Sequence, residues 1–187
     1  EAIIRYLIDT RNIKEKYNPK DPEQRAFINR YMPFQHTQVA FNTIRYFRAS
    51  HPEFFPGLPY TLEEVTPQLV ATCEAFEEHY LKNNKYIAGG NDITFADLFA
   101  VNHFSQVYYT TDFDYSRFPK LKAYIERVLE NPVMQELHTP IKQLGEDLKR
   151  KKAAEKEQNI VKKADKQEKI SKSSKRSKLF RIFHINK

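Results

Sequence analysis

Apolar residues recur at spacings of three and four along most of the chain, and no stretch of useful length alternates apolar with polar residues. This periodicity is typical of amphipathic helices rather than strands. The sequence therefore predicts an all-α protein. A first helix is expected over residues 2–9, with an apolar stripe of Ile3, Ile4 and Leu7.

A long helix is predicted from Asp21-Pro22 to about Arg48. Aspartate is a favoured N-cap, and proline suits the first helical position because its φ is already helical. Pro33 lies inside the pattern and predicts a kink, because its ring removes one hydrogen bond and crowds the preceding turn. The expected apolar face consists of Phe27, Tyr31, Phe34 and Phe41.

Two capping boxes mark further helix starts, one at Thr61 and Glu64 and one at Thr94 and Asp97. In such a box the two side chains each satisfy a backbone amide at the helix start. The hydrophobic staple around the second box is Ile93 and Leu98. The helix after the first box is expected to carry an apolar stripe of Leu62, Val65, Leu69, Cys73, Phe76 and Tyr80.

Prolines set the remaining boundaries. The stretch 51–60 holds three of them and is expected to be a loop, whereas a proline at the first position predicts helices over about 119–130 and 132–138. A last helix is expected to begin at Thr139-Pro140 and to run toward the C-terminus.

The net charge of +7 is unevenly distributed. Residues 149–187 hold 15 Lys and Arg against four Asp and Glu, a balance of +11, and the preceding 148 residues carry −4. This segment has too few apolar residues to form a core, so a basic, disordered or solvated helical tail is expected. The basic character of the chain therefore does not make its globular part a nucleic-acid-binding domain.

Candidate chemistry within the globular part is sparse. No HExxH pair, glycine-rich phosphate loop, GxSxG sequence or CxxC pair occurs, and no metal site is predicted. The single cysteine, Cys73, is interpreted as a core residue rather than a nucleophile and fits a reducing compartment. Asp97 has the chemistry of a catalytic carboxylate, but its capping position accounts for it fully.

Two segments leave alternatives open. Gln35-His36-Thr37-Gln38 follows the expected kink on an otherwise aromatic helix. It lines a polar pocket or a cleft between subunits, or else it forms a solvated helix face. The tail is either a solubilising extension or an arm that contacts anionic membrane or nucleic acid through its charge. The apolar residues at its end suit shallow insertion into a bilayer interface: Leu179, Phe180, Ile182, Phe183 and Ile185.

Four sequence blocks occur in an order and spacing that identify a family: AIIRYL, YNPKDPEQRAFINRYMPFQHTQV, KYIAGGNDITFADLFA and FPKLKAYIERVLENP. Together they resemble the C-terminal half of cytosolic glutathione S-transferases, most closely the theta class. Tyr124 stands where the family often has Trp.

The resemblance implies an all-α C-terminal transferase domain over residues 20–148. It makes residues 1–12 the last helix of a thioredoxin-like domain and leaves 149–187 as the basic tail. The family joins glutathione, as co-substrate, to electrophilic small molecules and works as a homodimer. Its catalytic hydroxyl would precede Glu1, so no catalytic residue is transferred to this chain, and the expectation is that the sequence is a piece of a longer cytoplasmic enzyme.

The resemblance also implies site residues. Thr37, Gln38, Val39 and Ala40 map to the turn that approaches glutathione bound to the partner subunit, although Ala40 replaces a frequent Arg. The substrate pocket is expected to include Phe34, Gln35 and Phe41. By the same resemblance Asp97 is a buried folding determinant.

A second hypothesis has the chain as a non-catalytic scaffold. In that case the transferase-like domain serves interactions, and the basic tail tethers it to anionic membrane or another partner. The long tail favours this hypothesis, because the transferase reaction does not need it.

Overall fold

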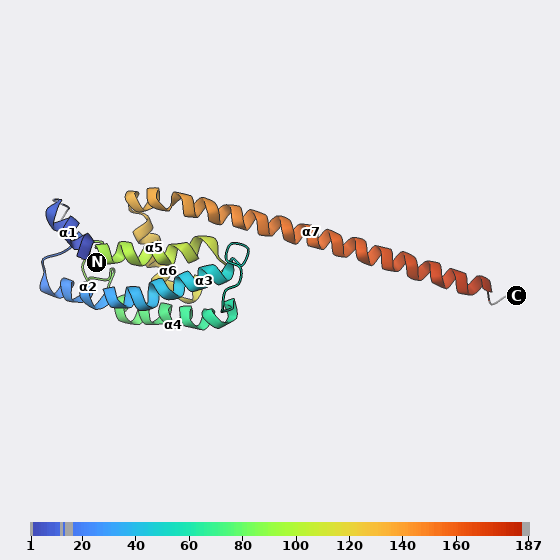
Figure 1. Cartoon of the computed structure of the whole chain (residues 1–187), viewed down its shortest axis with the longest axis horizontal. Helices are drawn as coiled ribbons and strands as arrows, with labels where there is room; N and C mark the ends of the chain where they lie inside the picture. Colours follow the sequence, from blue (N-terminus) through green and yellow to red (C-terminus); the bar gives the residue numbers. More distant parts are fainter. Residues whose placement is uncertain (1, 12, 14–16, 185–187) are drawn as a thin grey trace. The chain divides into compact units, whose positions relative to one another are not determined.

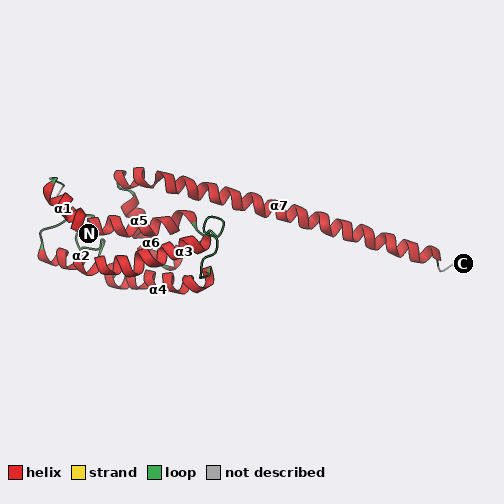
Figure 2. Ribbon diagram, in the orientation of Figure 1, coloured by secondary structure: helices red, strands yellow, loops and turns green. Residues whose placement is uncertain are grey.

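The computed structural model describes the backbone of residues 2–11, 13 and 17–184, and the side chains as far as Gln158. Within these residues every regular element is a helix, so the all-α prediction is confirmed (Figure 2). Two compact units are distinguished, one up to Gly145 and the other from Glu146 onward. The elements are α1 (Ala2–Thr10), α2 (Pro22–Phe34), the π-helical segment η2 (Gln35–Ala40), α3 (Phe41–Ser50), α4 (Leu62–Tyr80), α5 (Phe95–Thr110), the 3₁₀ turn η3 (Tyr115–Arg117), α6 (Pro119–Leu129) and α7 (Pro132–His184).

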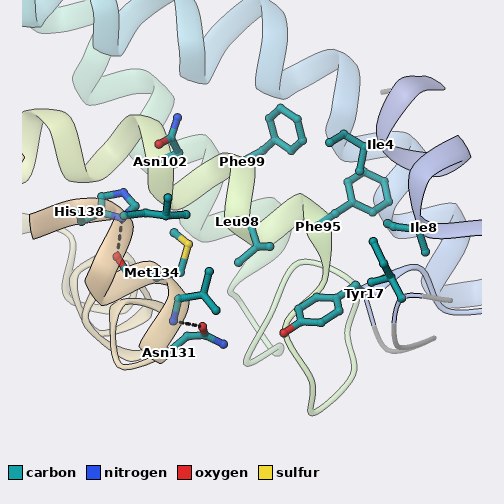
Figure 3. A pocket seen from close by; sticks show the side chains of 13 residues that line it. Ile4, Ile8, Tyr17, Phe95, Leu98, Phe99, Asn102, Asn131, Met134 and His138 are labelled. Atoms are coloured by element: carbon teal, nitrogen blue, oxygen red, sulfur yellow. Dashed lines mark hydrogen bonds between the residues drawn. The ribbon is translucent and has the colours of Figure 1, made fainter. Parts of the chain in front are cut away.

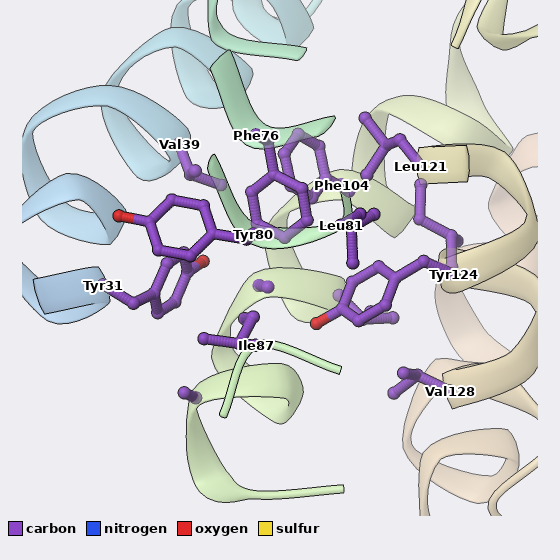
Figure 4. Close-up of a cluster of buried hydrophobic side chains, with 14 of the residues drawn as sticks. Tyr31, Val39, Phe76, Tyr80, Leu81, Ile87, Phe104, Leu121, Tyr124 and Val128 are labelled. Carbon is purple, nitrogen blue, oxygen red and sulfur yellow. The ribbon is translucent and has the colours of Figure 1, made fainter. Parts of the chain in front are cut away.

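The first unit is a helical bundle in which α3 packs against α4 and α5, and α5 packs against α6 (Figure 1). Its core is strongly aromatic (Figure 4). Phe76 lies at the centre, with ring centroids 5.9 Å from Tyr31, 5.1 Å from Phe104 and 5.4 Å from Tyr124. These four rings come from four different helices, so their edge-to-face and tilted contacts join α2, α4, α5 and α6.

The predicted kink at Pro33 has a specific form. Instead of one bent α-helix to about Arg48, the chain forms α2, then the π segment η2, then α3. A π turn holds an extra residue and often accompanies a functional site. The Thr37 hydroxyl donates to the carbonyl of Pro33 at 2.8 Å and so satisfies a carbonyl beside the irregular turn.

The capping box at the start of α5 is deeply buried, unlike the one that starts α4. Both Asp97 carboxylate oxygens accept hydrogen bonds: from the amides of Thr94 (2.7 Å) and Ile87 (2.9 Å), and from the hydroxyls of Thr94 (2.8 Å) and Tyr124 (2.9 Å). Burial raises the pKa of Asp97, and these four donors oppose that shift. A single carboxylate thereby joins the loop before α5, the start of α5 and the middle of α6.

Cys73 is fully buried on α4, in keeping with its interpretation as a core residue. Burial is the main cause that raises the pKa of its thiol, and Glu77 and Glu74 add to the shift. A neutral thiol without access to solvent is a poor nucleophile. The side chain therefore serves packing.

Three residues assigned to apolar faces are instead exposed, and these assignments were wrong. Ile3 is 74% exposed, and the buried residue of α1 is instead Ile8. Phe41 is 53% exposed and lies beneath the Arg45 guanidinium, 5.1 Å from the ring centroid. Leu62 is 39% exposed at the first position of α4.

The expected break near residue 139 is absent. One helix, α7, runs from Pro132 to His184 and includes Pro140. Proline leaves one helical carbonyl without its donor, here that of Glu136. Both residues are exposed, so water can satisfy this carbonyl and the helix continues. Helix α7 also includes most of the predicted basic tail, although Ile185 lies outside the described residues.

Candidate functional site

An apolar cavity of about 520 Å³ lies within the first unit, between α1, α5 and the first turns of α7 (Figure 3). Each helix lines it with residues at helical spacing, which place neighbouring side chains on one face. The apolar lining includes Ile4 and Ile8 from α1, Phe95, Leu98 and Phe99 from α5, and Met134 from α7. Tyr17, in the segment between α1 and α2, lines the cavity at the α1 end.

Few polar side chains line this cavity. His138 is 6% exposed, and its Nδ1 lies 2.8 Å from the carbonyl oxygen of Met134. Nδ1 therefore donates to this carbonyl, and Nε2 is buried and has no hydrogen-bond partner among the described residues. Asn131 accepts from the amide of Val133 at 3.0 Å (Figure 3). An apolar cavity with so few polar groups suits an apolar molecule or the apolar part of a larger one.

A second cavity of about 430 Å³ lies on the other side of His138 and is more polar. It shares Asn102, Leu137 and His138 with the first cavity. Arg48 and His103 are among its other lining residues. Burial lowers the pKa of His103, which keeps this ring neutral at neutral pH. His138 thus lines two cavities, one apolar and the other more polar.

The four residues predicted to approach glutathione lie in the π segment η2. Thr37 and Gln38 are exposed, Ala40 is half-buried and Val39 is fully buried. The Gln38 side-chain oxygen accepts from the Asn42 amide at 3.4 Å, and that amide also donates to the Thr72 hydroxyl at 2.8 Å. Of these four residues, only Thr37 and Gln38 therefore offer exposed polar side chains.

The three residues predicted for the substrate pocket are not brought together. Phe34 is half-buried against Tyr31 and Tyr80, with centroid distances of 6.4 and 5.5 Å. Gln35 is buried and accepts a hydrogen bond from the Tyr31 hydroxyl. Phe41 is exposed, and none of the three predicted residues lines the apolar cavity.

The apolar cavity could not be recognised from the sequence, for a physical reason. Its lining residues read as ordinary helix stripes, since Ile4 and Ile8, or Phe95 and Phe99, differ by one helical turn. A stripe is compatible with either a filled core or an open cavity. Only the placement of α1 and α7 relative to α5 distinguishes them.

No cluster of three or more His, Cys, Asp or Glu with the arrangement of a metal site occurs in the described part of the chain. Among those same residues, no helix has the length and hydropathy required to cross a membrane.

Comparison with known proteins identifies the helical domain. Residues 50–132 match the family model of the glutathione S-transferase C-terminal domain. The chain is 26% identical to glutathione S-transferase theta-1 of Homo sapiens over 147 residues, which cover 75% of this chain and 61% of that protein. It is 30% identical to glutathione S-transferase theta-1 of Gallus gallus over 105 residues, covering 54% of this chain and 40% of that protein.

Solved structures of glutathione transferases also match this chain. An epsilon-class glutathione S-transferase from Musca domestica matches with a TM-score of 0.64 and 28% identity, covering 80% of this chain and 67% of that one. A glutathione transferase homolog from Drosophila mojavensis, with bound glutathione, gives 0.64 and 26%, covering 79% and 66%. Human glutathione S-transferase T1-1 in its apo form shares the fold, with a TM-score of 0.65, 24% identity and coverage of 78% and 63%.

This chain spans between 40% and 61% of the length of the theta-1 relatives described above. Both the matches and the all-helical structure correspond to the C-terminal domain of these transferases. We conclude that the helical domain of this chain has the fold of the glutathione S-transferase C-terminal domain, with a sequence similar to that of the theta class.

Proposed function

We propose that this domain is the substrate-binding and dimerisation half of a theta-like glutathione transferase, which joins glutathione to electrophilic small molecules. The apolar cavity between α1, α5 and α7 carries this proposal. Its volume of about 520 Å³ suits a small molecule, and its few polar groups suit an electrophile with an apolar body. Holding that body still beside the attacking thiolate lowers the entropic part of the barrier.

The activation of the glutathione thiol is assigned to a different domain. In the reaction the glutathione thiolate forms a sulfur–carbon bond with the electrophile. Either a leaving group departs with the electron pair of its bond to that carbon, or the π bond of an activated double bond breaks and the resulting anion takes a proton from water. The group that lowers the pKa of the thiol belongs, by family resemblance, to a thioredoxin-like domain. Here the described cysteine is buried and its pKa is raised, so it does not substitute for that group.

The proposed contact with glutathione is made across a homodimer by the exposed turn of η2. Thr37 and Gln38 carry the accessible hydroxyl and amide groups. Ala40 has no charge to offer to a carboxylate of glutathione, so this contact rests on neutral hydrogen bonds, which are weaker than charge-assisted ones.

The 187-residue chain by itself is expected to show no conjugating activity. Its rate with glutathione and a panel of small electrophiles should equal the rate of a blank that contains glutathione alone, because no described residue activates the thiol. The measurement is initial rate at saturating glutathione, with a complete theta-class transferase as positive control. Turnover above the blank would contradict the assignment of thiol activation to a different domain.

The cavity itself is expected to bind an uncharged apolar fluorescent probe such as N-phenyl-1-naphthylamine. Leu137 is 67% exposed at its rim, so Leu137→Glu should leave the fold intact while placing a charge beside the apolar lining. We expect at least about a fivefold loss of probe affinity, because each buried methylene of contact contributes roughly 0.8 kcal/mol.

The matched control for this experiment is Phe54→Glu. Phe54 is 51% exposed, lies in the loop between α3 and α4 and is not among the residues that line the apolar cavity. This variant should bind the probe as the unmodified chain does. An equal loss of affinity in both variants would show that the probe reports general surface hydrophobicity and not this cavity.

A further inference from the structure

The last sixteen residues of α7, 169–184, differ in charge from the rest of the tail. They hold six Lys and Arg and no Asp or Glu, whereas residues 149–168 hold eight basic and four acidic residues. The backbone is helical throughout both stretches. A purely cationic helical segment thus follows a segment of mixed charge.

Apolar residues are concentrated at the end of this cationic segment. Leu179, Phe180, Ile182 and Phe183 lie within two helical turns, after four serines at positions 171, 173, 174 and 177. On a helix, residues three and four positions apart share a face. Leu179, Ile182 and Phe183 therefore occupy one face of the helix.

We propose that residues 169–184 bind the surface of a bilayer rich in anionic lipid. Basic residues are attracted to the negative surface potential of such a membrane, and an apolar group in the same helix inserts at the boundary of the headgroups and acyl chains. Each signal alone gives marginal binding, and the two together give stable peripheral attachment.

The apolar residues favour lipid over nucleic acid as the partner. Basic residues serve either partner, since both are polyanions. Proteins that bind single strands interleave aromatic side chains with basic ones so that bases can stack. Residues 149–178 hold no aromatic residue, and both phenylalanines of the tail follow that stretch at positions 180 and 183.

This inference does not depend on the proposed transferase function. Residues 169–184 belong to the second unit, and the two cavities and the turn of η2 belong to the first. Loss of lipid binding would leave the proposed conjugation unaffected, and absence of conjugation would leave lipid binding intact.

The test is co-sedimentation of the 187-residue chain with phosphatidylcholine vesicles that contain, or lack, about one third phosphatidylserine. We expect at least about tenfold tighter binding to the anionic vesicles. Binding should weaken as salt is raised, because screening shortens the reach of the surface potential. Truncation after Glu168 should abolish binding to the anionic vesicles.

Two matched variants separate insertion from charge. Replacement of Leu179, Phe180, Ile182 and Phe183 by Gln keeps all six positive charges and should weaken binding to anionic vesicles at least about fivefold. Replacement of the four serines by Gln introduces the same number of glutamines in the same segment and should leave binding unchanged.

Three results would overturn the proposal. The first is equal sedimentation of the chain with neutral and anionic vesicles. The second is binding of the apolar variant to anionic vesicles as tightly as the unmodified chain. The third is tighter binding to a DNA duplex or single strand than to anionic vesicles, unchanged in the apolar variant, which would make nucleic acid the partner.

Discussion

Asp97→Ala is expected to destabilise the helical domain by about 3–5 kcal/mol, because it leaves four donors buried and unsatisfied. Asp97 is fully buried, and its partners come from the preceding loop, the start of α5 and the middle of α6. In urea unfolding followed by circular dichroism the midpoint should fall sharply. The melting temperature should fall by roughly 10 °C or more.

Glu64→Ala is the matched control for this prediction. Glu64 occupies the same position in the exposed capping box of α4, where its carboxylate accepts from the Thr61 amide at 2.7 Å. Water can replace that partner, so the loss of stability should be much smaller. Equal losses in the two variants would contradict the claim that Asp97 holds three parts of the domain together.

Gly145→Ala is the second substitution with a large expected effect. It is expected to lower the free energy of unfolding, whereas the same substitution in most helices raises it. In an open helix, alanine is favoured over glycine by about 1 kcal/mol. At position 145, however, an added Cβ would overlap the backbone carbonyl of Tyr109 on α5. Because backbone cannot move aside as a side chain can, we expect a net loss of about 2–3 kcal/mol instead of a gain.

The control for Gly145 is Gly90→Ala. A Cβ at Gly90 would lie 3.0 Å from the Nε2 atom of Gln24, the flexible end of a side chain that can rotate away. Its effect on urea unfolding should therefore be small. A stabilising Gly145→Ala would contradict the close approach of α7 to α5 in the first unit.

The helices could be predicted where the determining interactions are local. The boxes at Thr61 and Thr94 are set by residues three positions apart, and both helices begin one residue after these caps. The proline signals at Pro22, Pro119 and Pro132 likewise mark helix starts. Each of these signals depends on a few neighbouring residues.

Features that depend on distant contacts or on solvent could not be predicted in the same way. The kink at Pro33 is a π segment whose register places Val39 in the core and Gln38 at the surface. Pro140 was expected to start a new helix, but exposure of its turn allows α7 to continue. The apolar cavity arises only from the arrangement of α1, α5 and α7, which the spacing within each helix does not specify.

The most direct test of the proposed transferase function is the conjugating activity of the protein isolated from its own cells. Antibodies against the helical domain would isolate the native polypeptide without altering its ends, and its initial rate would be measured with glutathione and a panel of electrophiles. We expect conjugation above the glutathione-only blank. A folded native protein that conjugates none of these electrophiles would contradict it and would favour the non-catalytic scaffold.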